Sequence, residues 1–249
     1  MERNNILEHI KNLLYILRDA EENITIPNKE SAWFGHCLLS YLLIRAVQPK
    51  TLVELGTHNG ISLASFLSFI KYLDLDCTCF GIDNWDGDKH TGDFNENVYL
   101  ATKLFFEQNF KYRSKLIKKN FDEALDDFDD GTIDFLHIDG YHTYDAAKKD
   151  FTNWLPKMNK NSVILIHDIH EYKEDFGVHF LWKEIKNEYR TLEFRNNHGL
   201  GLAFLGFPDF KRLIFDMDEQ EVEVDVLIKI IELYGERFAF KKNYQMCKK

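Results

Sequence analysis

The chain has 249 residues, of which 45% are apolar and 14% aromatic, so it can bury one substantial core and does not belong to the disordered class. Its formal net charge of −10 excludes nucleic acid as the expected partner, because affinity for a phosphate backbone depends on clustered Lys and Arg. The sequence has neither a signal-peptide pattern nor about 18 consecutive apolar residues, so we expect no membrane insertion and a cytoplasmic protein.

Apolar periodicity predicts two N-terminal helices and then a regular alternation of strands and helices. Apolar positions from Ile6 to Leu17 have helical spacing, and a second helix is predicted from Ser31 to Val47. The predicted strands are Thr51–Leu55, Cys77–Ile82, Lys115–Ile117, Ile133–Ile138 and Ser162–Ile166. The predicted helices between and after them are Ile61–Leu73, Glu96–Asn109, Phe121–Phe128, Tyr144–Leu155 and Val178–Tyr189. Apolar strands separated by helices indicate a mostly parallel sheet that is covered on both faces.

The end of the chain predicts a hairpin followed by a helix. Thr191–Arg195 and Leu200–Leu205 are expected to be strands joined by a tight turn, and Asp218–Phe240 is expected to be helical. The predicted fold is therefore α/β and Rossmann-like, with a mostly parallel seven-stranded sheet, a C-terminal antiparallel hairpin and extra N-terminal helices. We divide the chain into an N-terminal helical extension at 1–48, a core at 49–210 and a C-terminal helical segment at 211–249.

Four cysteines follow no zinc-binding or secreted-scaffold spacing. Cys77 and Cys79 fall on alternate positions of an apolar strand. We therefore expect Cys37, Cys77, Cys79 and Cys247 to be reduced thiols in the core.

A glycine loop follows the first strand. Glu54 is near the end of that strand, and Gly56 and Gly60 flank three residues before a helix begins. Glycine lets the backbone approach a ligand closely, and the free amides of a helix start favour an anionic group. The spacing differs from the G-x-G-x-x-G of dinucleotide-binding folds and suits S-adenosylmethionine (SAM), whose methionine half has a carboxylate and an ammonium that Glu54 would favour directly or through water. We expect SAM contacts from Glu54, Gly56, Thr57, Gly60 and Ser62; the alternative is a turn that only connects strand to helix.

An acidic residue also ends the second strand. In a Rossmann-type unit, an acid at the position of Asp83 accepts hydrogen bonds from ribose hydroxyls. Both NAD and SAM contain adenosine, so Asp83 indicates an adenosine cofactor without choosing between them. Asn84 is expected to contact the same cofactor, and Asn120, after the third strand, is placed to meet the adenine edge.

A second group of polar residues follows two later strands. Asp139 and His142 come after the strand Ile133–Ile138, and His167 and Asp168 come after Ser162–Ile166. Adjacent parallel strands present their carboxyl ends to one crevice, so we expect these four side chains to converge near the cofactor's sulfonium. Aromatic and imidazole rings predicted to rim the same crevice belong to Trp85, His90, Tyr141, Tyr144, Trp182 and His198.

With these motifs the chain resembles methyltransferases that are found with, or fused to, glycosyltransferases in bacterial glycan clusters. The resemblance covers roughly residues 52–206 and is carried by Val53–Thr57, Gly81–Asp88, Ile133–Gly140, His142–Tyr144, His167–Asp168 and His198–Gly201. It implies a class I SAM-dependent O-methyltransferase that acts on a sugar or a related small acceptor.

More distantly, the second half is similar to metal-dependent sugar O-methyltransferases of macrolide biosynthesis. That similarity implies Asp139 and Asp168 as metal ligands and His142 as the general base. This chain has His167 where those enzymes have an acid, and Ile169 where they have another candidate ligand. Because magnesium prefers oxygen ligands, a site made of Asp139, Asp168 and His167 leaves magnesium, manganese and no metal all open.

The expected chemistry is transfer of a methyl group to a hydroxyl oxygen. His142 is the expected base because an unperturbed imidazole accepts a proton near neutral pH, and Asp139 is expected to assist it. Three alternatives stay open: an NAD-dependent oxidoreductase, a metal-dependent hydrolase that also uses His170, and a catalytically silent SAM-binding partner of a glycosyltransferase. The acceptor and the oligomeric state are not defined by the sequence, although helices outside the core are expected to offer a dimer surface.

Overall fold

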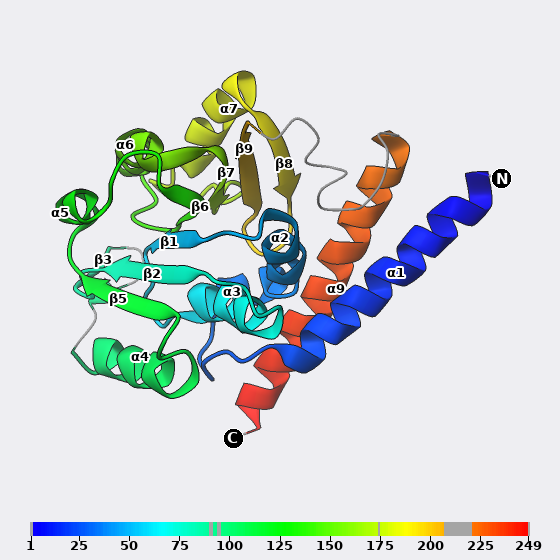
Figure 1. The fold of residues 1–249 in the computed structure, drawn as a ribbon, viewed down its shortest axis with the longest axis horizontal. Coiled ribbons are helices and arrows are strands. Elements are labelled where there is room, and N and C mark those ends of the chain that lie inside the picture. The colour runs from blue at the N-terminus through cyan, green and yellow to red at the C-terminus, as the bar shows by residue number, and fades with distance from the viewer. Residues whose placement is uncertain (1, 90–91, 94–95, 174, 207–220, 249) are drawn as a thin grey trace.

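A computed structural model describes residues 2–89, 92–93, 96–173, 175–206 and 221–248. The sheet has seven strands in the order β5-β2-β1-β6-β7-β9-β8 (Figure 1). The five parallel strands are β1 (Thr51–Leu55), β2 (Thr78–Asp83), β5 (Ser114–Lys118), β6 (Ile133–Ile138) and β7 (Met158–His167). The hairpin strands β8 (Arg190–Phe194) and β9 (Leu200–Leu205) are antiparallel, and β9 pairs with β7. The predicted fold class is therefore confirmed.

Helices cover both faces of the sheet, as Figure 1 shows. On one face lie α1 (Glu2–Asn23), the 3₁₀ helix η1 (Ala32–His36), α2 (Leu39–Val47), α3 (Ile61–Tyr72) and α9 (Glu221–Cys247). On the other lie α5 (Phe121–Ala124), η2 (Leu125–Asp127), α6 (Tyr144–Trp154), η3 (Leu155–Lys157) and α7 (Val178–Glu188). Alternate residues of a strand point to opposite faces, so Leu52 joins the first core and Val53 the second.

A small ribbon and a helix lie between β2 and β5. The strands β3 (Gly87–Asp88) and β4 (Gly92–Asp93) form a small antiparallel ribbon, which the sequence did not predict. The helix α4 (Glu96–Asn109) follows with its predicted bounds.

The predicted second helix, Ser31–Val47, is divided in the structure. Ser31 caps η1 by accepting a hydrogen bond from the amide of Trp33, and α2 begins only at Leu39. The α9 helix packs against η1 at Gly235, where an added Cβ would lie 2.0 Å from the carbonyl oxygen of Gly35. The backbone contact therefore requires glycine at position 235, and it fixes the segment that carries Trp33.

Other predicted boundaries also shift. The fifth parallel strand starts at Met158 instead of Ser162, and the helix after Asn120 turns into a 3₁₀ turn beyond Ala124. The C-terminal helix continues past Phe240 to Cys247, while the start of its predicted range, 218–220, lies outside the described residues.

The cysteine prediction is correct for three of the four residues. Cys37, Cys77 and Cys79 are buried free thiols, but Cys247 is exposed at the end of α9, so its assignment to the core was wrong. Within the described part of the chain, no helix is both apolar enough and long enough to span a membrane.

Candidate functional site

A pocket of about 550 Å³ opens at the carboxyl edge of the parallel strands. This volume lies within the range of pockets that hold cofactors and small substrates. The predicted residues Gly56, Thr57, Gly60, Ser62, Asp83, Asn84, Asn120, Asp139, His142, His167 and Asp168 all line it. Of the twelve predicted site residues, only Glu54 is missing from its wall.

The glycine loop lies close to the neighbouring strand end. Gly56 has a φ of +90°, and a Cβ there would lie 1.9 Å from the carbonyl oxygen of Asp139. The amide of Asp139 donates to the carbonyl of Leu55 at 2.9 Å, which joins the ends of β1 and β6. Gly60, with a φ of +74°, comes directly before α3. The loop thus brings backbone and the start of a helix to the pocket wall, as the prediction required.

Asp83 organises the adjacent loop from the end of β2. Its carboxylate accepts hydrogen bonds from the amides of His58 at 2.8 Å and Trp85 at 2.7 Å. The side-chain amide of Asn84 donates to the side-chain oxygen of Asn120 at 3.1 Å, so these two residues meet across the ends of β2 and β5. The three predicted adenosine contacts are therefore neighbours on one wall.

Glu54 is fully buried beneath this wall. In the register of β1 and β6 it pairs with His137, and His137 Nδ1 lies 2.9 Å from Glu54 Oε2. Burial raises the pKa of the Glu54 carboxyl, and contacts with His137 and Ser62 offset part of this effect. A direct contact between Glu54 and the SAM ammonium is thus not available in this structure, because the strand register turns the side chain toward His137. Ser62 contacts Glu54 and also lines the pocket.

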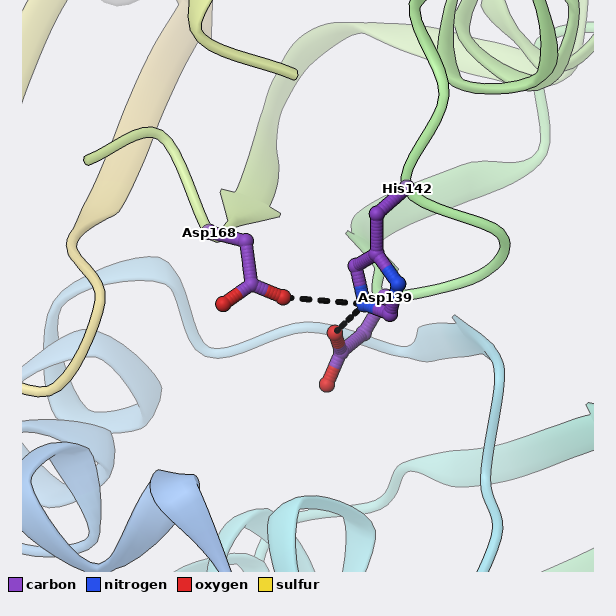
Figure 2. Close-up of side chains that lie close together, drawn as sticks. All are labelled: Asp139, His142 and Asp168. Atoms are coloured by element: carbon purple, nitrogen blue, oxygen red, sulfur yellow. Dashed lines mark ion pairs between the residues drawn. The ribbon is translucent and has the colours of Figure 1, made fainter. Parts of the chain in front are cut away.

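At the other end of the pocket, two carboxylates and two imidazoles converge as predicted. His142 Nε2 lies 2.9 Å from Asp168 Oδ2 and 3.8 Å from Asp139 Oδ1 (Figure 2). His167 Nδ1 lies 3.2 Å from Asp168 Oδ2 and 3.5 Å from Asp139 Oδ1. Asp168 directly follows β7 with a φ of +60°, a backbone conformation that is rare for residues other than glycine.

The electrostatics of this group differ from the prediction for a free imidazole. Burial opposes the charged form of His142, but hydrogen bonds and charges of Asp139 and Asp168 outweigh it and raise the pKa to about 10. Burial also opposes ionisation of Asp139 and Asp168, but the neighbouring histidines hold both pKa values below the usual range. Without a metal ion, these contacts favour the imidazolium form of His142, in contrast to the unperturbed imidazole that the sequence led us to expect.

The atoms arranged to hold a metal ion come from Asp139, His142 and Asp168. One ligand atom of each lies within 4.8 Å of the others. His167, which we expected as the third ligand, is not part of this set. It is buried, its Nδ1 lies within 3.5 Å of both carboxylates, and its ring lies 5.5 Å from that of His36. Two carboxylates and one imidazole can coordinate a divalent cation, and they are a better set for manganese than for magnesium.

Sequence reasoning missed Trp33, the aromatic residue at the centre of that buried layer. Its ring centroid lies 4.6 Å from that of His137, 5.3 Å from that of His36 and 5.6 Å from that of His167. Its indole nitrogen donates to Ser65 Oγ at 3.0 Å. Burial, together with the charge of His167, lowers the pKa of His36 to about 3, so His36 is neutral. Trp33 lines the pocket but belongs to no local motif, so no sequence pattern indicated it.

Three further residues beyond the end of β7, Glu171, Lys173 and Phe176, line the pocket and were not among the individually predicted site residues. Phe176 stacks on His142 with ring centroids 4.7 Å apart and planes 16° apart. Glu171 accepts from the amides of Tyr172 and Lys173, and His198 Nδ1 lies 2.7 Å from Glu171 Oε2. Glu171 thus joins the loop after β7 to the β8–β9 turn.

Of the aromatic and imidazole residues predicted to rim the crevice, Tyr141 and His198 line the pocket. Trp85 and Trp182 are buried, and their indole nitrogens donate to the His58 carbonyl and to Glu193. The Tyr144 hydroxyl donates to Glu184, and His90 lies outside the described residues.

The geometry can now be compared with known proteins. Residues 53–169 match the family model of the methyltransferase domain. The protein y4gI of Sinorhizobium fredii is 40% identical over 176 residues, which are 71% of this chain but only 19% of that protein. This chain thus spans about one fifth of the length of this curated relative.

Solved structures show the same fold. A methyltransferase from Geobacter sulfurreducens is similar with a TM-score of 0.52 and 15% identity, over 80% of this chain and 90% of the other. The O-methyltransferase TomG from Streptomyces achromogenes, solved with SAM, has a TM-score of 0.53 and 16% identity over 72% and 82% of the two chains. The SAH-bound methyltransferase PaMTH1 from Podospora anserina has a TM-score of 0.52 and 15% identity over 80% and 87%.

The family model of the methyltransferase domain matches residues 53–169, and the fold is shared with solved methyltransferases that bind SAM or SAH. Both findings agree with the predicted class of enzyme. The match favours this class over the oxidoreductase and the hydrolase, because it includes both the glycine loop and the two polar strand ends.

Proposed function

We propose that this chain transfers the methyl group of SAM to a hydroxyl oxygen of a sugar or related small acceptor. The observation that carries this proposal is one pocket with two different ends: the glycine loop and Asp83 at one, and the cluster of Asp139, His142 and Asp168 at the other. A cofactor bound along the first wall would direct its sulfonium toward that cluster.

The reaction that we propose is a single displacement. The acceptor oxygen forms a bond to the methyl carbon as the bond from carbon to sulfur breaks, which leaves S-adenosylhomocysteine (SAH), and the hydroxyl proton passes to His142. Because Asp139 and Asp168 favour the imidazolium, proton uptake by neutral His142 is favourable, but its proton must be released before the next turnover. Phe176 would hold the imidazole ring with Nε2 toward the carboxylates.

Asp139, His142 and Asp168 would also hold a divalent cation. When bound, such an ion supplies a positive charge that lowers the pKa of an acceptor hydroxyl. An ion there replaces the proton on His142, so the metal and the base role of His142 are alternatives that chelation separates. Turnover that survives exhaustive chelation assigns proton uptake to His142, whereas turnover that returns only with Mn²⁺ or Mg²⁺ assigns the site to the ion.

The sugar acceptor is supported by the chemistry around the cluster and by the sequence resemblance to glycan-cluster methyltransferases. Glu30, Glu171, Lys173 and His198 supply hydrogen-bonding groups on this side of the pocket, and Trp33 and Phe176 supply ring surfaces. Polyhydroxylated rings are recognised by this combination of polar groups and aromatic faces.

Two measurements test the proposal. Calorimetry should show binding of SAH and no binding of NADH, and radiolabelled SAM should transfer its methyl group to members of a panel of free sugars, nucleotide sugars and oligosaccharides. SAH binding without transfer to any of them would support the silent partner instead. Failure to bind SAH would reject both functions.

A further inference from the structure

The helices α1 and α9 lie side by side at the edge of the molecule, as Figure 1 shows. Glu21 of α1 forms ion pairs with Arg237 and, at 2.7 Å, with Lys241 of α9. Among the described residues, none that lines the pocket belongs to either helix. These helices therefore have exposed surface that the methyltransferase site does not use.

The solvent-facing line of α9 is apolar. Val226, Leu233 and Phe240 are 40%, 53% and 73% exposed. They are seven residues apart, and a seven-residue step returns a side chain to within about 20° of the same line on a helix. Tyr244 stacks on Phe240 and extends the line, with 54% of its surface exposed. Large apolar residues that align on a helix in this way are typical of a helix-packing surface.

The neighbouring helix continues this apolar surface. Leu7 and Leu14 of α1 are 52% and 39% exposed, and they precede Glu21 at the same seven-residue spacing. Because Glu21 contacts α9, Leu7 and Leu14 lie along the flank of α1 that borders α9. We call the surface of Leu7, Leu14, Val226, Leu233 and Phe240 the α1–α9 face.

Two opposite charges flank the apolar line of α9. Lys229 comes three residues after Val226, and Glu236 comes three residues after Leu233. Both charged residues therefore lie on the same side of the apolar line, about 60° from it around the helix. Both are exposed. Lys229 comes four residues before Leu233, and Glu236 comes three residues after it. If a second α9 helix runs antiparallel to the first and is centred on Leu233, Lys229 of one helix therefore lies at nearly the same height along the axis as Glu236 of the other.

We propose that the α1–α9 face binds the same face of a second copy of this chain, with the two α9 helices antiparallel about Leu233. In this arrangement Val226 of each copy faces Phe240 of the other, and the two Leu233 side chains meet at the twofold axis. Lys229 of each copy lies beside Glu236 of the other. Arg237, on the opposite flank, is neutralised within its own chain by Glu21.

The chemistry favours a second copy as the occupant because the face is complementary to itself. A twofold interface requires that each residue and its partner both appear on one surface, and the apolar line and the Lys229 and Glu236 pair meet that condition in the antiparallel direction. In a parallel pairing, the Lys229 and Glu236 side chains of one copy would lie on the opposite side of the interface from those of the other, so no Lys229 would meet a Glu236. The antiparallel dimer combines α1 and α9 of both copies into a four-helix arrangement.

Sedimentation velocity of the full chain at micromolar concentrations tests the proposal. We expect a species of twice the 29.5 kDa mass of one chain. Leu233→Glu would place two carboxylates at the twofold axis and should weaken the dimer by about 100-fold or more. The matched control is Leu104→Glu on α4, which replaces a leucine of similar exposure, 54%, and should leave the dimer intact.

Charge exchange distinguishes a second copy from another partner. Lys229→Glu and Glu236→Lys should each weaken self-association by about 10-fold, because each places like charges together. An equimolar mixture of the two variants should associate as strongly as the wild type, since each chain then faces opposite charges. Circular dichroism and SAH binding should show that both variants are folded. A wild-type chain that is a monomer throughout, or a mixture that associates no better than its components, would overturn the proposal.

Discussion

Asp83 and Asp168 both follow buried strands at the same edge of the sheet, but the two ends of the pocket that they mark are built differently. Around Asp83 the interactions are mostly with backbone, since the carboxylate accepts from the amides of His58 and Trp85. Around Asp168 they are between ionisable side chains, with His142 at 2.9 Å and His167 at 3.2 Å. The first end is suited to holding a ligand in place, and the second is suited to moving a proton.

This comparison predicts that substitutions at the two ends separate cofactor binding from turnover. The largest effect is expected at His142. His142→Ala should lower kcat by about 10³-fold, which is the usual contribution of a general base, and should leave the Kd for SAH unchanged. Single-turnover transfer from radiolabelled SAM, together with calorimetry for SAH, measures both quantities. His179→Ala, at a histidine of α7 that does not line the pocket, is the control. Undiminished turnover in His142→Ala would remove His142 from the reaction.

The next effect concerns the backbone of the cofactor end. Gly56→Ala should lower the free energy of unfolding by about 3 kcal/mol or more. The added Cβ would clash with the Asp139 carbonyl, and alanine is strained at the positive φ of this position. Gly131→Ala is the matched control: its φ of +71° is also left-handed, but no atom lies within 4 Å of the added Cβ. That variant should lose only about 1 kcal/mol. Equal losses in urea denaturation would show that the close approach of β1 and β6 contributes nothing.

A smaller effect is expected at Asp83. Asp83→Asn keeps the shape of the side chain but removes the charge that favours ribose hydroxyl donors, so the Kd for SAH should rise by about 10-fold to 30-fold. The rate at saturating SAM should stay near that of the wild type. Asp86→Asn, at an exposed aspartate of the same loop, should change neither quantity. A loss of kcat without a change in Kd would contradict the division of the pocket into two ends.

The smallest predicted effect is a pH dependence of stability from Asp150, a buried residue of α6 packed near Gly140. Burial, and secondarily the charge of Asp122, raises its pKa from 3.8 to about 7. Between these values the folded state binds more protons than the unfolded state, so the free energy of unfolding should fall as pH rises from about 4 to about 7.

The substitution Asp150→Asn should remove this fall and stabilise the protein by about 1–2 kcal/mol at pH 8. Urea denaturation at pH 5 and pH 8 measures the difference between the two conditions. Asp126→Asn, at an exposed aspartate, should leave the pH dependence unchanged. If Asp150→Asn keeps the full pH dependence, the buried carboxyl is not its source.

The sequence predicted the geometry of the Asp83 end of the pocket better than that of the Asp168 end. Gly56, Gly60 and Asp83 act through local backbone geometry, which a short motif specifies. The pKa of His142 instead depends on Asp139 and on Asp168, and Asp168 is 26 positions away in sequence. The same holds for Glu54, because the surroundings of its side chain depend on the strand register that places it beside His137, 83 positions away.

Most strands were predicted within a few residues of their observed bounds, because buried parallel strands are continuous apolar runs. The second N-terminal helix was less predictable. Its apolar pattern is continuous from Trp33 to Val47, while its division into η1 and α2 involves the capping bond at Ser31 and the packing of Gly35 against Gly235. The second of these contacts joins residues 200 positions apart, so no local pattern contains it.

The antiparallel direction of β9 brings the turn before this strand to the pocket. Since β9 starts where β7 ends, the turn with Asn197, His198 and Gly199 reaches the mouth of the pocket from the hairpin, independently of the loops that follow the parallel strands. Exchange of these few residues would alter this wall of the pocket while the loops after β1 and β2 keep their structure. The shape of the pocket can therefore change through one tight turn.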